Sequence, residues 1–237
     1  RMYSKKDYEK LPHHDSAAIK RYNYYHSILQ LKAAGVKNLI KFKYLEKLTE
    51  EDKRDLKADI KILQFLDALD RNENITELGK RFVQFTLDPT LSRALAEAVK
   101  LGCEEEVMRM IALYLKDWKL YIKNAHPTTK MNFAKSDGDF MMLGEIYKTY
   151  ESFIKGERYN ACEKWAQDNH LNLKSLENAE DSLEWLRKFV ESLKEIIQPD
   201  QQLIASMDLE KRILKSFFEG NWFNTAKLDG TVHKLLR

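Results

Sequence analysis

Apolar residues recur every three or four positions along the first third of the chain, which is typical of amphipathic helices. The pattern predicts one helix over residues 21–34 that stops at Gly35, and a second that starts after Thr49 with an acidic first turn. The second helix and the turn after it carry one apolar face, which consists of Leu56, Ile60, Leu63, Leu66 and Leu69. Residues 75–82 read as a short strand entering a short helix. These elements together predict a winged-helix-like module.

The rest of the chain shows helix starts and stops at short intervals. Asp88 and Pro89 form a strong start signal, and Gly102 marks the stop of that helix. A further helix is expected from Cys103 to Leu115, with an inner face of Val107, Met110, Ile111 and Tyr114. The remaining predicted elements are a loop over 116–135, a helix that restarts at 137–139 and is interrupted by Gly156, helices over 157–168, 178–197 and 207–219, and a strand over 221–226. Such an array of helices with short connections predicts a helical bundle.

Composition agrees with a helix-dominated chain. The 237 residues include only eight glycines and four prolines, too few for a disordered or turn-rich all-β protein. No run of about 18 uncharged apolar residues is present, which argues against a membrane span. Cys103 and Cys162 are isolated from each other and from histidines, so neither a disulfide scaffold nor a zinc site is expected. A reducing, intracellular compartment fits this cysteine usage.

The chain has a formal net charge of only +3, but its charges are segregated. Residues 1–47 carry a balance of +7 and residues 116–135 a balance of +4, whereas the remaining stretches are net acidic. The second basic stretch holds five lysines and one acid: Lys116, Lys119, Lys123, Lys130 and Lys135. Contact with the phosphates of a polyanion and simple solvation of the lysines are both open interpretations.

Motifs for catalysis are missing from the chain. It has no GxxxxGK[ST] phosphate loop, no GxGxxG and no HExxH, and its paired acids lie at helix starts, where capping accounts for them. We therefore expect no catalytic residue, no metal site and no bound cofactor. The aromatic residues Tyr22, Tyr24 and Tyr25 allow base stacking, but packing of a helix is favoured. The four tryptophans, at 118, 165, 185 and 222, are expected in the core.

Several segments resemble the DEAH-box (DEAH/RHA) RNA helicases in the region that follows their second RecA-like domain. FLDALD and ITELG at 65–79 are similar to the family's "L..L.ALD....LT.LG". FTLDPTLSR at 85–93 and LGCEEE at 101–106 are similar to "FPLDP.LS" and "LGC.EE". Residues 133–143 resemble the segment that opens the ratchet domain, and residues 220–228 resemble the start of the OB-fold. The motifs occur in the family's order over nearly the whole chain.

The resemblance implies a mainly α fold with a winged helix, a ratchet bundle and the first strands of a truncated OB-fold. The domain boundaries that it implies are 1–20 for the tail of the second RecA-like domain and a connector, 21–89 for the winged helix, 90–205 for the ratchet domain and 206–237 for the start of the OB-fold. ATP and Mg²⁺ would be bound by motor domains outside this chain. The single-stranded RNA contacts would come from the five lysines above and Lys174.

The family's "GDHLTLLNVY" reads GDFMMLGEIY at 138–147, so its polar His, Thr and Asn have become Phe140, Met142 and Glu145. A family arginine further along is replaced by Leu183. These departures put RNA contact at the ratchet positions in question.

Three functions are weighed. The first is an accessory region that forms part of the RNA channel and couples motor movement to strand translocation in pre-mRNA splicing or ribosome biogenesis, in the nucleus rather than the cytoplasm. The second is a docking platform for a G-patch-type activator or a ribonucleoprotein, with little RNA contact. The third, a free-standing winged-helix DNA binder, is disfavoured because residues 48–79 are net acidic. The expected partners are RNA and the motor domains, with no membrane.

Overall fold

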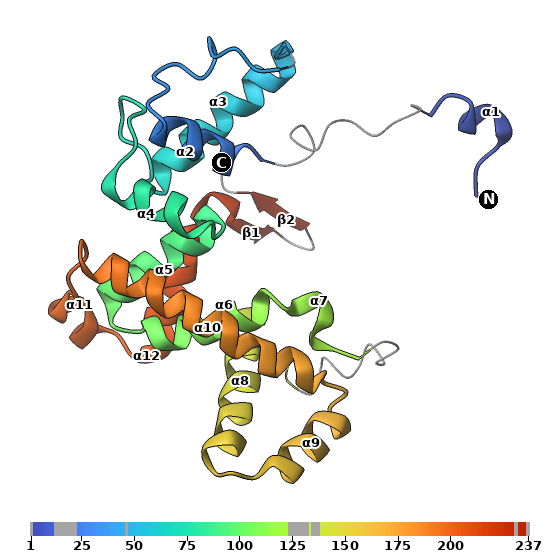
Figure 1. Ribbon diagram of the computed structural model, residues 1–237, viewed down its shortest axis with the longest axis vertical. Coiled ribbons are helices and arrows are strands. Elements are labelled where there is room, and N and C mark those ends of the chain that lie inside the picture. Colours follow the sequence, from blue (N-terminus) through green and yellow to red (C-terminus); the bar gives the residue numbers. More distant parts are fainter. Residues whose placement is uncertain are drawn as a thin grey trace.

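The computed structural model describes residues 2–11, 23–45, 47–122, 133, 138–229 and 232–235 (Figure 1). Helices account for most of these residues, and the strands among them form one short antiparallel pair. The mainly α fold predicted from the sequence is therefore confirmed. Near the beginning of the chain, Ser4 caps a single-turn helix, α1 (Lys5–Tyr8).

The first packed unit contains α2 (Tyr25–Ala33), α3 (Glu50–Phe65) and α4 (Glu77–Phe85). Thr49 begins α3 as predicted, and it forms a capping box in which its hydroxyl and the Asp52 carboxylate each accept a backbone N–H. A β-bridge pairs Leu69 with Ile75 between α3 and α4. The predicted apolar face of α3 is buried throughout. Three helices and a minimal β element thus form the predicted winged-helix unit.

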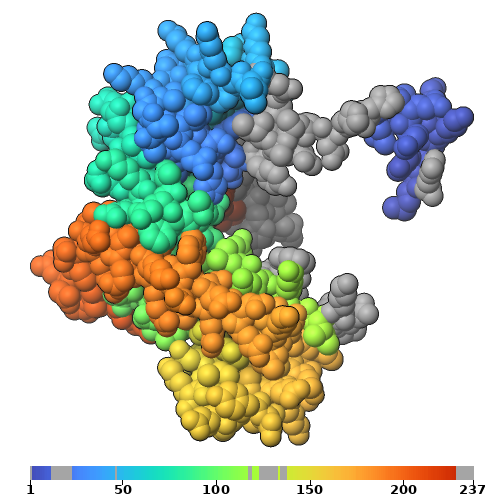
Figure 2. Space-filling view, in the orientation of Figure 1, coloured from blue at the N-terminus to red at the C-terminus, as the bar shows by residue number. Residues whose placement is uncertain are grey.

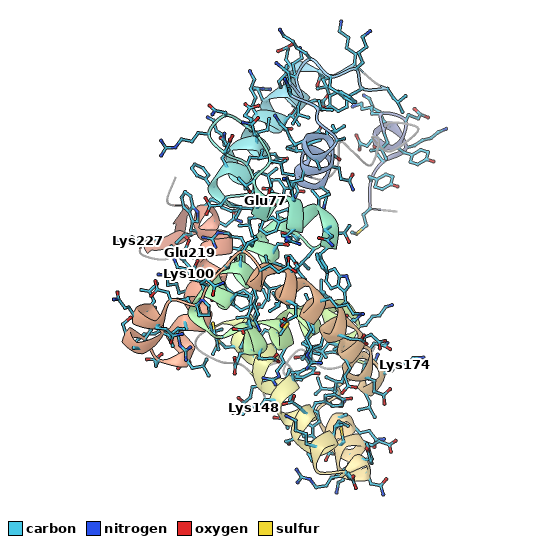
Figure 3. The ribbon with its side chains drawn as sticks, turned by 60° about the vertical axis from the view of Figure 1, so that its left-hand side comes forward. Glu77, Lys100, Lys148, Lys174, Glu219 and Lys227 are labelled. Carbon is cyan, nitrogen blue, oxygen red and sulfur yellow. The ribbon has the colours of Figure 1, made fainter. Side chains whose placement is uncertain are left out.

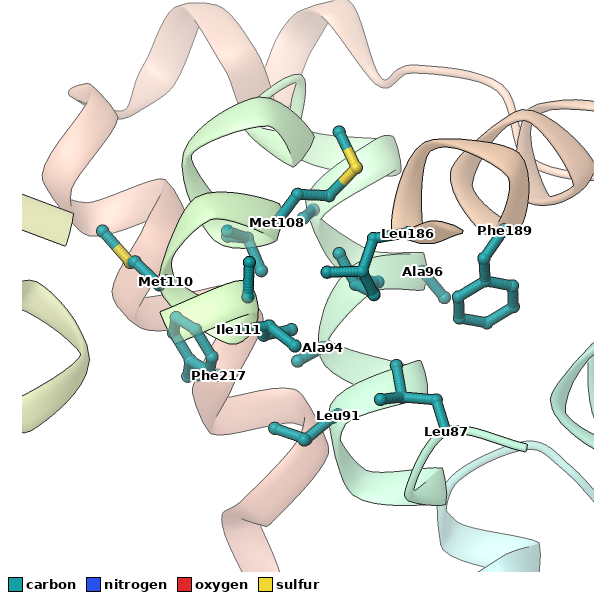
Figure 4. Packing of buried hydrophobic residues seen from close by; sticks show 14 of the residues in the cluster. Leu87, Leu91, Ala94, Ala96, Met108, Met110, Ile111, Leu186, Phe189 and Phe217 are labelled. Atoms are coloured by element: carbon teal, nitrogen blue, oxygen red, sulfur yellow. The ribbon is translucent and has the colours of Figure 1, made fainter. Parts of the chain in front are cut away.

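The centre of the molecule is α5 (Pro89–Leu101), which has the predicted bounds. The Asp88 carboxylate accepts the Thr90 N–H at 2.8 Å, and Gly102 ends the helix with a φ of +60°. Helices α6 (Glu104–Tyr114), α10 (Leu173–Lys194) and α12 (Leu209–Asn221) surround α5 (Figure 4). As a result, ten of the 13 residues of α5 are buried.

The remaining helices lie around this centre. They are α7 (Asp117–Leu120), α8 (Asp139–Lys155), α9 (Tyr159–Asp168) and α11 (Gln201–Ser206). A loop was predicted over 116–135, and this prediction was wrong for Asp117–Leu120, which form the helical turn α7. Helix α10 begins five residues before its predicted start, and α11 was not predicted. A turn as short as α11 holds too few apolar positions to show a helical period.

The end of the described chain departs from the prediction of a strand over 221–226. Helix α12 continues to Asn221 and passes into a 3₁₀ turn, η3 (Trp222–Asn224), and the Asn221 side-chain amide donates to the Phe217 carbonyl at 3.2 Å. Strands β1 (Ala226–Asp229) and β2 (Val232–Leu235) then pair antiparallel, with Ala226 opposite Leu235. That these two strands are the first strands of a truncated OB-fold stays a prediction.

Side chains expected in the core behave in different ways. Trp165 and Trp185 are only half-buried against it, and Trp222 packs edge-on against Phe65, with 4.9 Å between the ring centroids. Nothing is described of the Trp118 side chain. Both cysteines are buried and free.

Candidate nucleic-acid interface

The six lysines predicted from the sequence to contact RNA fall into two groups. Lys116 precedes α7 and is half-buried, whereas Lys119 in α7 and Lys174 in the first turn of α10 are exposed. The other three, Lys123, Lys130 and Lys135, lie outside the described residues.

A short β-bridge brings Lys119 and Lys174 to the same end of α10, although 55 positions separate them in sequence. Tyr121 pairs with Leu171, and the Asn172 N–H donates to the Leu120 carbonyl at 2.8 Å. The hydroxyl of Ser175, which follows Lys174, donates to the Lys119 carbonyl at 2.8 Å. Figure 3 shows Lys174 at the surface of this end of α10. We call Lys116, Lys119 and Lys174 the lysine ridge.

A groove of about 690 Å³ lies where α2, α5, α6, α8 and α12 meet. Its aromatic lining consists of Tyr25, Tyr114, Phe140, Phe217, Phe218 and Phe223. Three side-chain amides also line it, from Asn23, Asn221 and Asn224. Aromatic rings beside amide groups offer both stacking and hydrogen bonding to a planar polar ligand. We call this hollow the aromatic groove.

Stacked rings shape the aromatic groove. Phe140 stacks on Phe217 with 3.8 Å between the ring centroids and 15° between the ring planes, and Tyr114 lies 5.1 Å from Phe140. Tyr114 keeps 45% of its surface exposed and Phe218 keeps 53%. The placement of Tyr114 on the inner face of its helix was therefore wrong. It lies in the last turn of α6, where Phe140 is the ring that packs against it.

The lysine ridge continues directly from the aromatic groove. Tyr114 and Leu115 line the groove, and Lys116 is the next residue, so the C-terminal end of α6 connects the rings to the lysines. In Figure 2 the yellow-green surface that includes this connection adjoins the orange surface of α10. The chain thus passes directly from two residues that line the aromatic groove to the first residue of the lysine ridge.

Tyr24 and Tyr25 behave as packing residues, which confirms the favoured interpretation, while Tyr22 lies outside the described residues. The Tyr24 N–H donates to Asp59 at 2.6 Å. Burial, together with Asp59 and Asp88, raises the pKa of Tyr25 to about 12. The Tyr25 hydroxyl therefore stays protonated at neutral pH.

The positions that depart from the family pattern have different surroundings. Phe140 lines the groove, and Leu183 is buried in α10. Met142 is half-buried and Glu145 is exposed. The change from His to Phe at 140 thus replaces a polar group by a ring in the groove, and sequence spacing alone did not reveal this. The sequence of α12 held a signal for the groove. Ile213 and Phe217 form one apolar pair four residues apart, and Leu214 and Phe218 form a second pair on a neighbouring face.

Other chemistry is limited in the part of the chain that the structure describes. No cluster there of three or more His, Cys, Asp or Glu side chains has the arrangement of a metal site. Burial raises the pKa of the Cys103 thiol to about 11, so the thiolate is scarce at neutral pH. No helix among the described residues has the length and apolar character needed to span a membrane.

Comparison with known proteins gives one family match, for residues 60–87, to the helicase associated domain (HA2), winged-helix. These residues run from the second half of α3 through α4, so the match falls on the first packed unit.

Curated relatives extend the similarity over most of the chain. The Probable ATP-dependent RNA helicase DHX35 of Homo sapiens is 27% identical over 237 residues, which is 98% of this chain and 31% of the relative. The pre-mRNA-splicing factor ATP-dependent RNA helicase prp22 of Schizosaccharomyces pombe is 26% identical, over 89% of this chain and 17% of the relative. The pre-mRNA-splicing factor ATP-dependent RNA helicase DEAH10 of Arabidopsis thaliana is 27% identical, over 81% and 28%. The chain spans less than a third of the length of these relatives. The resemblance to the DEAH-box RNA helicases is thus confirmed, and these matches support the interpretation of the chain as a C-terminal fragment of such a helicase.

Proposed function

We propose that this chain is the C-terminal accessory region of an ATP-dependent RNA helicase and that it forms part of a single-stranded RNA channel. One observation carries the proposal: Tyr114 and Leu115 line the aromatic groove, and the next residue, Lys116, begins the lysine ridge. The names of the relatives support RNA as the ligand and ATP-driven movement as the context.

The chemistry of this face suits a strand that has to move. Lysines contact phosphates, which all nucleotides share, and aromatic rings stack on any base. Neither contact reads sequence, so a strand can shift along the face without meeting a preferred register. The proposed role of the region is to hold the strand while motor domains change their separation, and thereby to convert their movement into translocation.

The proposed domain boundaries are those that the resemblance implies: 21–89, 90–205 and 206–237, preceded by a tail of the motor. Helix α12 belongs to the last segment, yet it packs along α5, the first helix of the proposed ratchet domain. ATP and Mg²⁺ would be bound by RecA-like motor domains, which we propose as partners of this region. The relatives named as splicing factors favour a nuclear role in pre-mRNA splicing, with ribosome biogenesis as the other pathway.

The test is binding of the 237-residue chain to a fluorescein-labelled 15-nucleotide oligouridylate, followed by fluorescence anisotropy at several salt concentrations. Each phosphate contact contributes a slope of about −0.7 to the log–log dependence on salt for single strands. The double variant Lys119→Ala/Lys174→Ala should therefore weaken binding and flatten that slope by about 1.4. Lys188→Ala is the matched control, because Lys188 lies on α10 outside the lysine ridge and pairs with Glu184 at 3.1 Å. Equal binding by the control and the double variant would contradict the proposal.

A protein-docking function is the second candidate, favoured by the exposed side chains of Leu214 and Phe218 beside the groove. A G-patch-type peptide is the probe for it. Retention of RNA binding in Phe218→Ala with loss of peptide binding would favour docking. Loss of RNA binding in the same variant would favour the RNA channel.

A further inference from the structure

A second basic surface lies far from the lysine ridge in sequence, in the segment between α2 and α3. Residues 36–48 follow Gly35 and include four exposed lysines: Lys37, Lys41, Lys43 and Lys47. We call this segment the basic loop. It lies at the top of the molecule in Figure 1, beside the start of α3, and within the blue surface at the top of Figure 2. The one acid in the segment, Glu46, lies outside the described residues.

These four lysines differ from others in the same unit. Lys53 on α3 pairs with Glu50 at 2.6 Å, and Lys32 on α2 lies 3.5 Å from Glu73. Within the described part of the chain, none of the lysines of the basic loop forms an ion pair. Their charges are therefore available to an external anion.

The basic loop has a defined shape because its beginning is anchored. Leu39 is 1% exposed and belongs to the core. The buried Lys32 ammonium donates to the Lys37 carbonyl at 2.9 Å, and the Lys41 N–H donates to the Asn38 side chain at 3.0 Å. A loop held in this way loses less conformational entropy when it binds a ligand.

Apolar groups at the surface alternate with the lysines. Phe42 lies between Lys41 and Lys43 and is 38% exposed, and its ring packs edge-on against Tyr44, with 5.0 Å between the centroids. Leu45 is fully exposed. A partly exposed aromatic ring flanked by two cations offers a base a stacking surface and offers the neighbouring phosphates a charge.

We propose that the basic loop is a second contact site for single-stranded RNA, separate from the lysine ridge and the aromatic groove. The inference rests on the proposed function only in taking RNA as the ligand. Single strands are favoured over duplexes because paired bases do not present their faces to a ring. RNA is favoured over an acidic protein surface because the exposed face of Phe42 adds a stacking surface to the lysine charges, and an acidic partner would use only the charges.

The experiment uses the 237-residue chain and the same labelled oligouridylate. Lys41→Ala/Lys43→Ala should weaken binding and flatten the salt slope by about 1.4, through loss of two phosphate contacts. Phe42→Leu keeps an apolar side chain but removes the ring, and it should raise Kd about fivefold or more with the slope unchanged. Lys57→Ala, at an exposed position on α3, is the control for loss of a single charge. Far-UV circular dichroism of each variant checks that the fold is kept.

Repeating the loop substitutions in the Lys119→Ala/Lys174→Ala background separates the two proposals. If the ridge substitutions have no effect but the loop substitutions do, the proposed channel fails and the basic loop stands. Wild-type affinity in both loop variants overturns the inference. Poly-glutamate that competes with the RNA as well as unlabelled oligouridylate of the same charge also overturns it, in favour of an acidic protein partner.

Discussion

Helices α3 and α5 lie on either side of α4 in sequence and have opposite surroundings. Of the 16 residues of α3, four are buried, and its charged face is open to solvent. Of the 13 residues of α5, ten are buried, including Ser92 and Glu97. A helix packed on several sides supplies stability, whereas a helix packed on one side leaves most of its surface available for binding.

This difference locates the candidate binding surfaces. Helix α5 reaches the aromatic groove only through its first turn, at Asp88, Thr90 and Leu91. The basic loop that precedes α3 in sequence is exposed at its four lysines. Both proposed RNA contacts therefore lie at the edges of packed units, where backbone is fixed by the core and side chains remain accessible.

The largest expected effect comes from truncating a side chain at the centre of α5. Leu95 is fully buried, so Leu95→Ala should lower the free energy of unfolding by about 2–5 kcal/mol through lost burial and the resulting cavity. Lys57→Ala on α3 should change it by less than about 0.5 kcal/mol. Urea unfolding followed by circular dichroism measures both. Similar losses of unfolding free energy in the two variants would contradict the proposed difference between α5 and α3.

A smaller loss is expected where α12 approaches α5. A Cβ at Gly220 would clash with the Thr90 carbonyl oxygen, and that backbone atom cannot move aside independently. Gly220→Ala should therefore cost about 1–3 kcal/mol in unfolding free energy and also weaken RNA binding at the aromatic groove.

Gly156→Ala is a suitable comparison for Gly220→Ala. The nearest atom to its added Cβ belongs to the flexible Arg158 side chain, so a smaller loss is expected. If the free energy of unfolding of Gly220→Ala equals that of the wild-type chain, the close contact between α12 and α5 does not contribute to stability.

At the start of α3, removal of the cap should have a moderate effect. Thr49→Ala deletes the hydroxyl of the capping box and should cost about 0.5–2 kcal/mol in unfolding free energy. Thr49→Ser retains a hydroxyl and should restore most of the loss. Urea unfolding provides the measurement, and an equal loss in the serine variant would argue against capping as the cause.

Sequence reasoning succeeded where local chemistry determines the structure. Thr49, Asp88, Pro89 and Gly102 act through contacts within a few residues, and each begins or ends a helix as predicted. The bundle and the winged-helix unit follow from apolar spacing.

The candidate site was predictable only in part, because it depends on contacts between distant segments. The β-bridge that brings Lys119 beside Lys174 has no local signature. Tyr114 follows the helical period of α6, and only the position of Phe140 shows that it lines a groove. Three of the six lysines lie outside the described residues, so their role stays a prediction.

The smallest expected effect concerns the pH dependence of α12. Asp208 caps this helix by accepting the Lys211 N–H at 2.9 Å, and the Lys211 ammonium lies 3.0 Å from the same carboxylate. These contacts, the backbone hydrogen bond first, lower the pKa of Asp208 below its usual 3.8. A carboxylate whose pKa is lowered by folding stabilises the folded state above its unfolded pKa, and this stabilisation is lost as the pH falls through the lowered value.

Asp208→Asn tests this assignment, because the amide oxygen still caps the helix but carries no charge. The variant should be slightly less stable than the wild-type chain at pH 6, and the difference should shrink as the pH approaches 3. Urea midpoints at both pH values measure it. A difference that stays constant would mean that the charge of Asp208 contributes nothing and that capping geometry alone holds the start of α12 in place against α5.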